Sequence, residues 1–227
     1  MCGRYVISKS ALELAEIFDA ELPVEFETVS YNIAPTNQVP ILVEREIDGV
    51  PLRELHPARF GLTPHWAKEL GTPLFNARIE TVLEKPSFKD AALKKRCVIP
   101  ASGYYEWDQD KNPTYIHSEI VLFAGIYSFW RDPAKAANDP SRWVLTAAIL
   151  TKPASPALEF IHERSPVFLS ADTLEAWIAP DYETTEELLE ALAAESDDVA
   201  SLLEHHPVSK AVGKVQENYK ELISPLL

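Results

Sequence analysis

The sequence predicts an α+β fold, a single domain of many short β-strands with helices at its periphery. Three observations predict it. Short runs rich in β-branched and aromatic residues recur along the chain, 18 prolines divide it into brief elements, and the regular β-helix-β alternation of a doubly wound parallel fold is missing. No G-x-G-x-x-G or Walker sequence occurs, which argues against a dinucleotide or nucleoside triphosphate ligand. With 227 residues, 46% of them hydrophobic, the chain can bury a core within one domain, 1–227.

The strand pattern is clearest in the middle of the chain. Residues 96–107, RCVIPASGYYEW, predict a strand, a turn and a second strand, and the polar residues 108–113 that follow predict a turn. Further strands are predicted over 39–46, 52–64 (ending in a Gly/Pro turn), 114–119, 120–130, 142–151 and 207–215. His205 and His206, just before the last of these, are expected in a solvated loop.

Three segments have helical patterns. Residues 8–18, SKSALELAEIF, space their apolar side chains for a short amphipathic helix behind a serine cap. Residues 87–96, SFKDAALKKR, predict a helix whose last turn is basic, where cations suit the helix dipole. Residues 181–204 hold nine acidic and no basic residues, with leucines at helical spacing, and predict one or two solvent-facing helices within the domain.

The net charge of −14 is unevenly distributed. Without the acidic segment 181–204, the rest of the chain carries only −5, from 21 basic and 26 acidic residues. Binding of a nucleic acid depends on the field at the binding surface and not on the total charge. A local basic groove is therefore compatible with this composition, and we expect the acidic segment to keep nucleic acid on the opposite side.

The composition also indicates what the protein lacks. No apolar run is long enough to span a membrane, and no secretory signal is present, so we expect a cytoplasmic protein that does not bind membranes. The two cysteines belong to no metal-binding spacing, so no metal or other cofactor is expected. Cys97 leads directly into the apolar run VIP and is interpreted as a buried strand cysteine.

Cys2 directly follows the initiator methionine. Trimming of Met1 would leave a thiol and an α-amine on one carbon. The α-amine has a pKa of about 7.7–8.0, against about 10.4 for lysine, so near neutral pH it is far more often the free base. Such an amine attacks an aldehyde to give a Schiff base, and the neighbouring thiolate can then close a five-membered thiazolidine ring. Catalysis of this kind needs further groups that move protons.

Four polar clusters offer such groups. In FNARIET, Asn76 and Arg78 would share one face of an extended chain, although a turn asparagine and a surface arginine fit equally well. In GYYEW, Glu106 lies between aromatic residues, where burial would raise its pKa and suit it to general acid catalysis; an edge-strand glutamate facing water is the simpler interpretation.

The other two clusters are equally open when taken alone. In IHERSPVFL, His162 and Arg164 share a side of an extended chain, but a single histidine beside an apolar run is more often structural. In GLTPHWA, Trp66 follows a Gly/Pro turn and could stack on a base if exposed, or belong to the core if buried.

Eight motifs, in order along the chain, resemble those of the SOS response-associated peptidase (SRAP) family. They are MCGRY, YNIAPTNQVPIL, GLTPHWA, FNARIET, CVIPASGYYEW, TKPAS, HERSPVFL and VSKAV. The resemblance covers essentially the whole chain, and the Cys-Gly-Arg start is its most specific part. It implies a compact domain with curved mixed or antiparallel β-sheets, barrel-like, around a basic groove.

The resemblance also implies a function in the DNA damage response. The protein would bind single-stranded DNA and crosslink covalently to abasic sites, with Cys2 capturing the ring-opened deoxyribose aldehyde as a thiazolidine. Met1 would first be removed by an autoproteolytic, peptidase-like activity. Asn76 would orient the terminal residue or a sugar oxygen, Glu106 would position the amine and transfer protons, and His162 would assist Schiff-base formation and reversal.

The remaining residues implied by the resemblance contact DNA. Arg4, Arg78 and Arg164 would meet phosphates, and Trp66 would stack against a base near the lesion. The implied partner is single-stranded DNA that contains abasic sites, with the protein a monomer in the cytoplasm and on the nucleoid when bound. The activity would be lyase-like, and it needs no cofactor.

Two other functions fit the same residues. A cysteine peptidase with an N-terminal nucleophile would attack peptide bonds through Cys2, using Glu106 or His162 as the base, and would turn over added peptides. A plain single-stranded nucleic-acid binder would tolerate Cys2→Ala. The crosslinking function requires both an aldehyde-bearing strand and Cys2.

Overall fold

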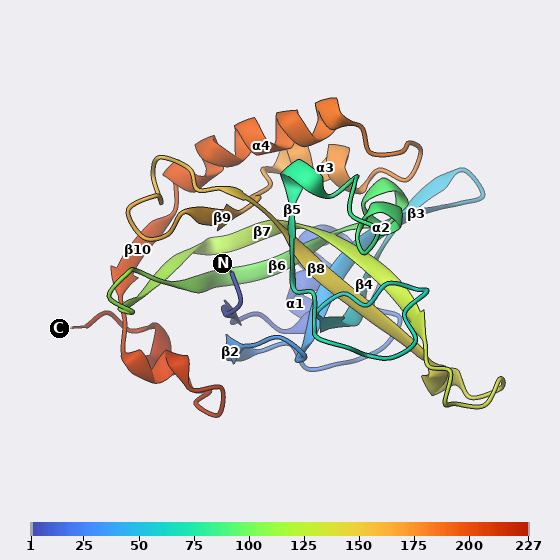
Figure 1. Cartoon of the computed structure of the whole chain (residues 1–227), viewed down its shortest axis with the longest axis horizontal. Helices are drawn as coiled ribbons and strands as arrows, with labels where there is room; N and C mark the ends of the chain where they lie inside the picture. The colour runs from blue at the N-terminus through green and yellow to red at the C-terminus, as the bar shows by residue number, and fades with distance from the viewer. Residues whose placement is uncertain (1, 227) are drawn as a thin grey trace.

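The computed structural model describes residues 2–226 and shows one mixed sheet of ten strands with four α-helices around it (Figure 1). The strands are β1 (Tyr5–Ile7), β2 (Ser30–Ile33), β3 (Gln38–Ile47), β4 (Val50–Phe60), β5 (Asn76–Arg78), β6 (Arg96–Trp107), β7 (Pro113–Arg131), β8 (Trp143–Pro153), β9 (Arg164–Pro166) and β10 (Glu204–Pro207). The α-helices are α1 (Ala11–Phe18), α2 (Lys89–Lys94), α3 (Ala171–Ile178) and α4 (Glu186–Ser201). Short 3₁₀ helices are η1 (Ile79–Thr81), η2 (Pro140–Arg142), η3 (Lys210–Gly213) and η4 (Lys220–Ile223). The predicted α+β fold is confirmed.

Five of the strands close a barrel. The pairing order runs β10-β7-β8-β4-β3-β6-β1-β2, and β6 pairs with β7 as well, so the path from β7 through β8, β4, β3 and β6 returns to β7. Most of these pairs are antiparallel, but β4 and β5 run parallel to β8. The predicted curved, barrel-like sheet is therefore present, with β1 and β2 continuing from β6 and β10 from β7.

The segment 96–107 is one continuous strand, which corrects the predicted strand, turn and strand. The register of β6 against β7 shifts between Ala101 and Gly103, so a local irregularity stands where the turn was expected. A side chain at Gly103 would lie 2.6 Å from the backbone oxygen of Ile116, so glycine lets the two strands approach closely. The small residues of this segment fit strand packing and do not form a turn.

The next strand is also continuous. β7 runs unbroken through the segments 114–119 and 120–130, which the sequence pattern separated into two strands. Its N-terminal part pairs with β10, its C-terminal part with β8, and most of its length with β6. The pairing to β6 skips the polar residues at its middle, between His117 and Val121, where the register shifts, and resumes beyond them.

The C-terminal prediction was wrong. The predicted strand 207–215 contains the 3₁₀ helix η3, which begins where the Ser209 side chain accepts a hydrogen bond from Ala211 N. The strand in this region is β10, and it includes His205 and His206, which were expected in a loop. Its backbone pairs with β7, a tertiary contact that local sequence does not report.

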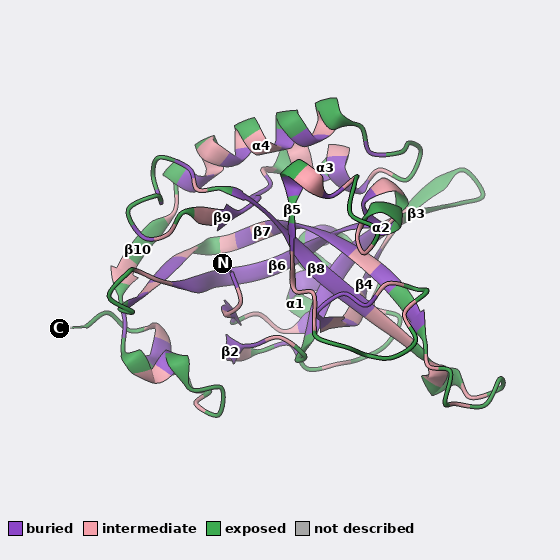
Figure 2. Ribbon diagram, in the orientation of Figure 1, coloured by how far each residue is buried: buried purple, intermediate pink, exposed green. Residues whose placement is uncertain are grey.

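The predicted helices are confirmed with shorter boundaries. α1 starts at a capping box in which Ser10 and Glu13 satisfy each other's backbone amides. The acidic segment 181–204 forms one helix, α4, capped by Thr185. Figure 2 shows exposed residues along the outer side of α4 and buried ones toward the sheet. No helix within 2–226 is both long and apolar enough to cross a membrane.

The main core fills the barrel and the space beneath the helices. β6, β7 and β8 are largely buried along their length (Figure 2). At its centre, Tyr5 makes edge-to-face contacts with Phe60 and Phe123, with ring centroids 5.3 and 5.9 Å apart. Tyr104 packs against Phe123 from β6. Because Tyr5 and Tyr104 are partners in the β1–β6 ladder, this core fixes the start of the chain.

Candidate functional site

The N-terminal residues enter the site alongside β6. β1 lies between β6 and β2, with Tyr5 opposite Tyr104, and the amide of Tyr105 donates a hydrogen bond to the carbonyl of Arg4. The residues before β1 therefore run antiparallel to the end of β6, which carries Glu106. This pairing brings the first described residue, Cys2, to the part of β6 that holds the buried carboxylate.

Cys2 is completely buried and is held by Asn76. The Nδ2 atom of Asn76 donates a hydrogen bond to the Cys2 carbonyl at 3.2 Å. The other amide atom, Oδ1, is buried and has no hydrogen-bond partner among the described residues. β5 places Asn76 here by pairing with β8, where Asn76 lies opposite Ile149. Asn76 thus fixes the backbone of Cys2 and keeps one acceptor available.

Glu106 is close enough to Cys2 to influence its ionisation. Burial raises the pKa of the Cys2 thiol well above its usual value, and the negative charge of Glu106 raises it further. Glu106 is itself only 4% exposed, and its Oε1 accepts a hydrogen bond from the Trp107 amide. Burial also raises the pKa of the Tyr104 hydroxyl, and the nearby charges of Cys2 and Glu106 raise it further. The Cys2 thiol is therefore protonated at neutral pH and lies within the electrostatic reach of Glu106.

His162 and Arg164 lie on the far side of β8 from β5. Thr151 of β8 pairs with Arg78 of β5 on one side and with Pro166 of β9 on the other. The Nδ1 atom of His162 accepts a hydrogen bond from the Arg164 amide at 3.0 Å. A neutral imidazole with an accepting Nδ1 carries its proton on Nε2. The backbone of β9 thus selects the tautomer of His162 that can donate from Nε2.

The guanidinium of Arg164 is engaged by protein acceptors. It makes a two-point ion pair with Glu80, at 2.6 and 3.0 Å, and donates to the carbonyl of Thr151 at 2.8 Å. Its side chain is 11% exposed, against 41% for Glu80. Arg78, by contrast, is exposed on β5. A phosphate would therefore meet Arg78 directly, whereas it would compete with Glu80 for Arg164.

Arg4 and Trp66 lie in different surroundings. The Arg4 guanidinium donates to the side chain of Asn32 and to two carbonyls near the C-terminus. Trp66 is 55% exposed on the loop between β4 and β5, so it is not a core residue. The next residue, Ala67, accepts a hydrogen bond from the indole of Trp130, which anchors this loop to β7.

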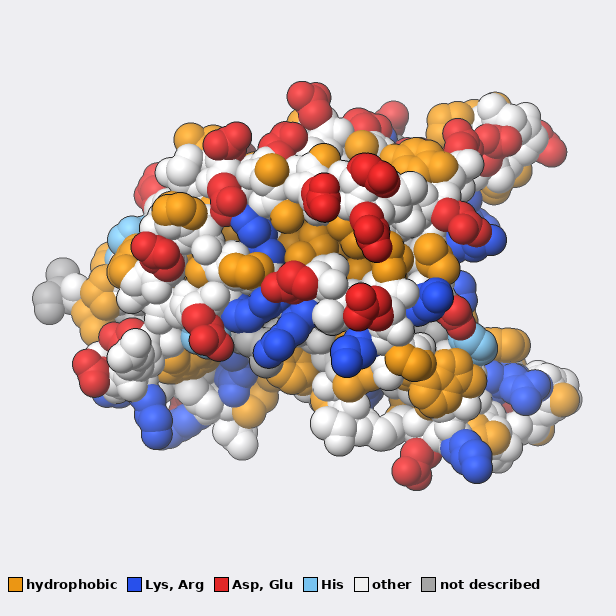
Figure 3. Space-filling view, turned by 45° about the horizontal axis from the view of Figure 1, so that its top comes forward, with side chains coloured by type: hydrophobic (Ala, Val, Ile, Leu, Met, Phe, Trp, Pro, Cys, Tyr) orange, Lys and Arg blue, Asp and Glu red, His pale blue; other side chains and the backbone are white. Residues whose placement is uncertain are grey.

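Charge on the surface agrees with a local basic region. Figure 3 shows Lys and Arg side chains gathered across the middle of one face, interspersed with a few acidic ones, while acidic side chains line the part above. The acidic helix α4 lies along the upper side of the molecule in Figure 1. None of the His, Cys, Asp and Glu side chains of residues 2–226 forms a group of three that could hold a metal ion.

The structure also places residues that the sequence patterns did not single out. Asn32, 3% exposed, lies within the YNIAP motif and contacts Arg4. Tyr104 lies within the electrostatic reach of both Cys2 and Glu106. In the sequence, these two residues are distinguished only because they belong to the motifs YNIAPTNQVPIL and CVIPASGYYEW. Cys97 is buried within β6, as predicted, and burial raises its pKa far above the usual range.

Comparisons with known proteins agree with these motifs. The family model described as SOS response associated peptidase (SRAP) matches residues 1–215. The abasic site processing protein YoqW of Bacillus subtilis is 34% identical over 98% of this chain and 99% of its own length. The abasic site processing protein YedK of Escherichia coli is 30% identical over the full length of both chains. The abasic site processing protein HMCES of Gallus gallus is 30% identical over 87% of this chain and 66% of its own.

Solved structures support the fold. A crystal structure of a protein from Bacteroides thetaiotaomicron superposes with a TM-score of 0.79 over the full length of both chains, at 23% sequence identity. A second, from Bordetella bronchiseptica, gives a TM-score of 0.66 over 92% of this chain, at 21% identity. At these identities the likeness concerns the arrangement of the strands and helices.

Proposed function

This chain belongs to the SOS response-associated peptidase family, and we propose that it binds single-stranded DNA and crosslinks to abasic sites through Cys2. The relatives that cover its full length are abasic site processing proteins. The observation that carries the proposal is the position of Cys2, held by Asn76 through its carbonyl and lying within the electrostatic reach of Glu106. A cysteine that was only a core residue would not need a buried carboxylate beside it.

The proposed reaction uses both functional groups of an N-terminal Cys2. Met1, which lies outside the described residues, must first be removed so that the α-amine becomes free. The amine then adds to the aldehyde of the ring-opened abasic sugar, and loss of one water gives a Schiff base. The thiolate then adds to the imine carbon and closes the five-membered ring. The ring nitrogen takes up a proton, which gives the neutral thiazolidine. One C–N and one C–S bond form, and one water leaves.

Glu106 and His162 would supply the proton transfers. Because the thiol is protonated at neutral pH, it needs a base, and Glu106 is the carboxylate whose charge reaches it. The departing hydroxyl of the amine adduct needs an acid, and the tautomer of His162 offers a proton from Nε2. Asn76, with its buried acceptor Oδ1, would orient the amine or a sugar hydroxyl.

The DNA strand would be held by charge and stacking. Arg78 is exposed on β5, directly beyond Asn76 in the same strand, and can meet a phosphate next to the lesion. Arg164 can meet a second phosphate once Glu80 is displaced. The exposed ring of Trp66 can stack on a base, an interaction worth about 1–3 kcal/mol in single-strand binding.

The proposal is tested by denaturing gel electrophoresis with a single-stranded oligonucleotide that carries one abasic site. A shifted band that survives heating is expected for the wild type and for Cys97→Ala, the matched control, and not for Cys2→Ala. An undamaged oligonucleotide should give no band with any variant. Intact mass measurement establishes whether Met1 is absent. If protein without Met1 gives no band, the crosslinking function is excluded, and turnover of added peptides would then test the peptidase alternative.

A further inference from the structure

The C-terminal segment 208–223 folds back onto the start of the chain. It contains η3 and η4 and has no role in the proposed chemistry, although it includes the VSKAV motif. In Figure 1 this segment lies below β10, on the side of the molecule where β2 ends. We call residues 208–223 the C-terminal clasp.

The clasp accepts hydrogen bonds from the side chain of Arg4, two residues from Cys2. The Nη1 atom of Arg4 donates to the carbonyl of Val212 at 2.8 Å, and Nη2 donates to the carbonyl of Gly213 at 3.2 Å. Nη1 also donates to Oδ1 of Asn32, at 2.8 Å. All three acceptors are uncharged oxygens, two from backbone carbonyls and one from a side-chain amide. Three of the five N–H donors of this guanidinium are therefore used within the protein.

Asn32 of β2 joins Arg4 and the clasp. While its Oδ1 accepts from Arg4, its Nδ2 donates to the carbonyls of Lys214 and Glu217, at 2.9 and 2.7 Å. Asn32 is 3% exposed, so the loss of any of these bonds would leave a buried polar group without a partner. Beside it, the Tyr31 amide donates to Oδ1 of Asn218 at 2.8 Å. The side chain of Asn32 therefore connects three segments far apart in the sequence.

A small apolar cluster, separate from the main core, seats the clasp beside the site. Its buried members are Val6, Tyr105, Tyr115, Val208, Val212 and Leu222. Two of these come from the elements that carry the proposed chemistry, since Val6 belongs to β1 and Tyr105 precedes Glu106. The hydroxyl of Tyr105 donates to the carbonyl of Tyr31 at 2.8 Å. The clasp thus packs against β1 and β6, the two strands that bring Cys2 and Glu106 together.

We propose that Arg4 is a positioning residue, which the C-terminal clasp and Asn32 hold so that the Cys2 backbone stays in place for crosslinking. This inference rests on the proposed function. It assigns Arg4 a role different from the phosphate contact implied by the family resemblance, because the guanidinium is already bonded to three protein acceptors. It also assigns one role to two motifs, because Val212 of VSKAV and Asn32 of YNIAP both accept hydrogen bonds from Arg4.

The two roles of Arg4 predict different measurements. A phosphate contact predicts that Arg4→Gln weakens binding to undamaged single-stranded DNA and lowers the salt slope by about 0.7. Positioning predicts that this variant binds undamaged DNA within about twofold of the wild type, with an unchanged slope, yet crosslinks about 10- to 100-fold more slowly at saturating DNA. Asn32→Ala, at a residue with no proposed DNA contact, should show the same pattern.

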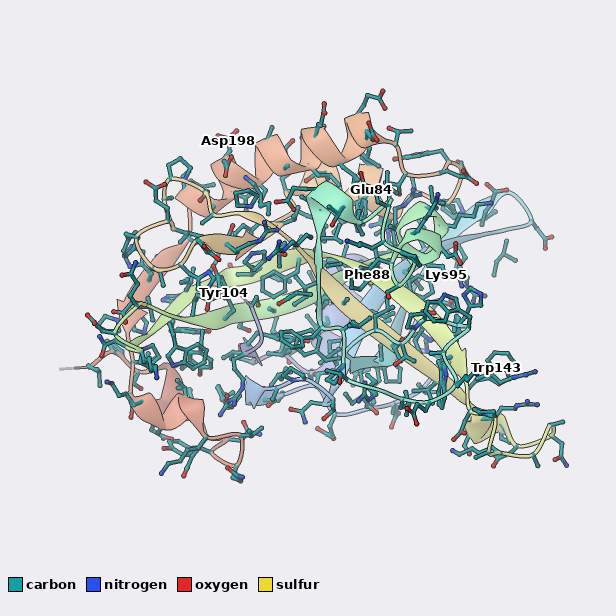
Figure 4. All side chains as sticks on the ribbon, in the orientation of Figure 1. Glu84, Phe88, Lys95, Tyr104, Trp143 and Asp198 are labelled. Atoms are coloured by element: carbon teal, nitrogen blue, oxygen red, sulfur yellow. The ribbon has the colours of Figure 1, made fainter. Side chains whose placement is uncertain are left out.

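The experiment measures crosslinking rate at saturation, affinity for undamaged DNA and reaction of Cys2 with a disulfide reagent, all in a Cys97→Ser background. Asn218→Ala, at an exposed residue, weakens the clasp in a protein that should fold normally, and should slow crosslinking about fivefold. Arg142→Gln is the matched control, because that guanidinium also donates to a backbone carbonyl. Arg142 directly precedes Trp143, which lies at the projecting end of the β7–β8 pair, far from the clasp (Figure 4). This variant should behave as the wild type.

Faster reaction of the Cys2 thiol in the Arg4, Asn32 and Asn218 variants, together with slower crosslinking, supports the proposal. Crosslinking and thiol reactivity at the wild-type level in the Asn32 and Asn218 variants would overturn it, as would a lowered salt slope for Arg4→Gln alone. If the wild type itself forms no crosslink, the proposed function fails, but the thiol measurement still reports whether the clasp holds Cys2.

Discussion

The side-chain amide of Asn76 donates a hydrogen bond to the backbone carbonyl of Cys2 across 3.2 Å, although 74 residues separate them in the sequence. Because Asn76 contacts the backbone carbonyl of Cys2, it orients this residue and leaves the thiol, the proposed reactive group, available. The strand β5, three residues long, exists at this place because it pairs with β8. Its pairing places the Asn76 amide at Cys2 and an exposed arginine, Arg78, two positions further on.

The first prediction concerns this amide. Asn76→Asp keeps the acceptor Oδ1 but replaces the Nδ2 donor with a second oxygen, which faces the Cys2 carbonyl. Loss of one hydrogen bond costs about 1 kcal/mol, and an unfavourable oxygen contact adds to it, so crosslinking at saturating DNA should slow by at least about fivefold. Asn76→Ala should have a similar effect. A rate within twofold of the wild type for both variants would show that this bond does not position Cys2.

The second prediction concerns the charge of Glu106. An anion disfavours a nearby thiolate, so Glu106→Gln should lower the pKa of Cys2, because burial remains but the repulsion is removed. The crosslinking rate should fall nevertheless, because the proton acceptor is lost. Titration of the thiolate by ultraviolet absorbance in a Cys97→Ser background measures the shift. A pKa that stays constant or rises would mean that the two groups do not interact as the structure shows.

The third prediction concerns stability at high pH. Burial raises the pKa of the thiol of Cys97 and of the hydroxyls of Tyr5 and Tyr104 above their unfolded values. The stability that these groups supply is fully present below the unfolded pKa, about 8.5 for cysteine, and is lost as the pH rises above it, because the unfolded chain then releases protons that the folded chain retains.

Urea unfolding at a series of pH values between 8 and 11 measures this loss. Each buried group that has ionised only in the unfolded state contributes about 1.4 kcal/mol per pH unit. Cys97→Ala removes one of them, so its free energy of unfolding should fall less steeply between pH 9 and 10 than that of the wild type. Equal slopes would indicate that the Cys97 thiol ionises in the folded protein.

How much of the site the sequence predicts depends on the range of the contacts. Cys2, Glu106 and His162 are visible as chemical groups because their residue types and motifs are local features. Their assembly is not local, since it depends on the β1–β6 and β8–β9 ladders, whose register comes from burial of the common core. The pairing of Arg164 with Glu80 and that of Arg4 with the C-terminal clasp were missed for the same reason.

The fold shows the same limit at particular residues. The sequence pattern predicts the strands but divides β6 at Ala-Ser-Gly and β7 near Ser118 and Glu119, because small and polar residues resemble turns. In the structure, the β6–β7 ladder shifts its register at these residues and continues on both sides of them, so each strand stays extended. At 207–215 the error had the opposite sense: PVSKAVGKV predicts a strand, but the Ser209 side chain caps a 3₁₀ helix there.

The fourth prediction uses the ion pair between Arg164 and Glu80. Since Glu80 occupies the guanidinium at two points, a phosphate must displace it. Glu80→Gln should therefore raise the affinity for undamaged single-stranded DNA several-fold and increase the salt slope by about 0.7, one additional phosphate contact. Glu84→Gln is the control, because it removes the same charge nearby; Glu84 lies beyond η1 in Figure 4 and makes no ion pair within 2–226. An equal effect of both variants would indicate general electrostatics and no competition for Arg164.

The last prediction concerns the acidic surface of α4. Glu187, Glu190 and Asp198 are exposed on this helix, and Asp198 points away from the sheet in Figure 4. Asp197 must be left unchanged, because it pairs with the nearly buried Lys152 at 2.5 Å and anchors the helix. If the acidic side chains repel DNA from this side, replacing Glu187, Glu190 and Asp198 with glutamine should strengthen binding to undamaged strands at low salt. The gain should shrink as the salt concentration rises past about 0.1 M, where charges more than about 10 Å apart are largely screened. Unchanged affinity at low salt would show that α4 serves only as a solvated cover for the sheet, and that the path of the DNA is determined by the residues around Cys2.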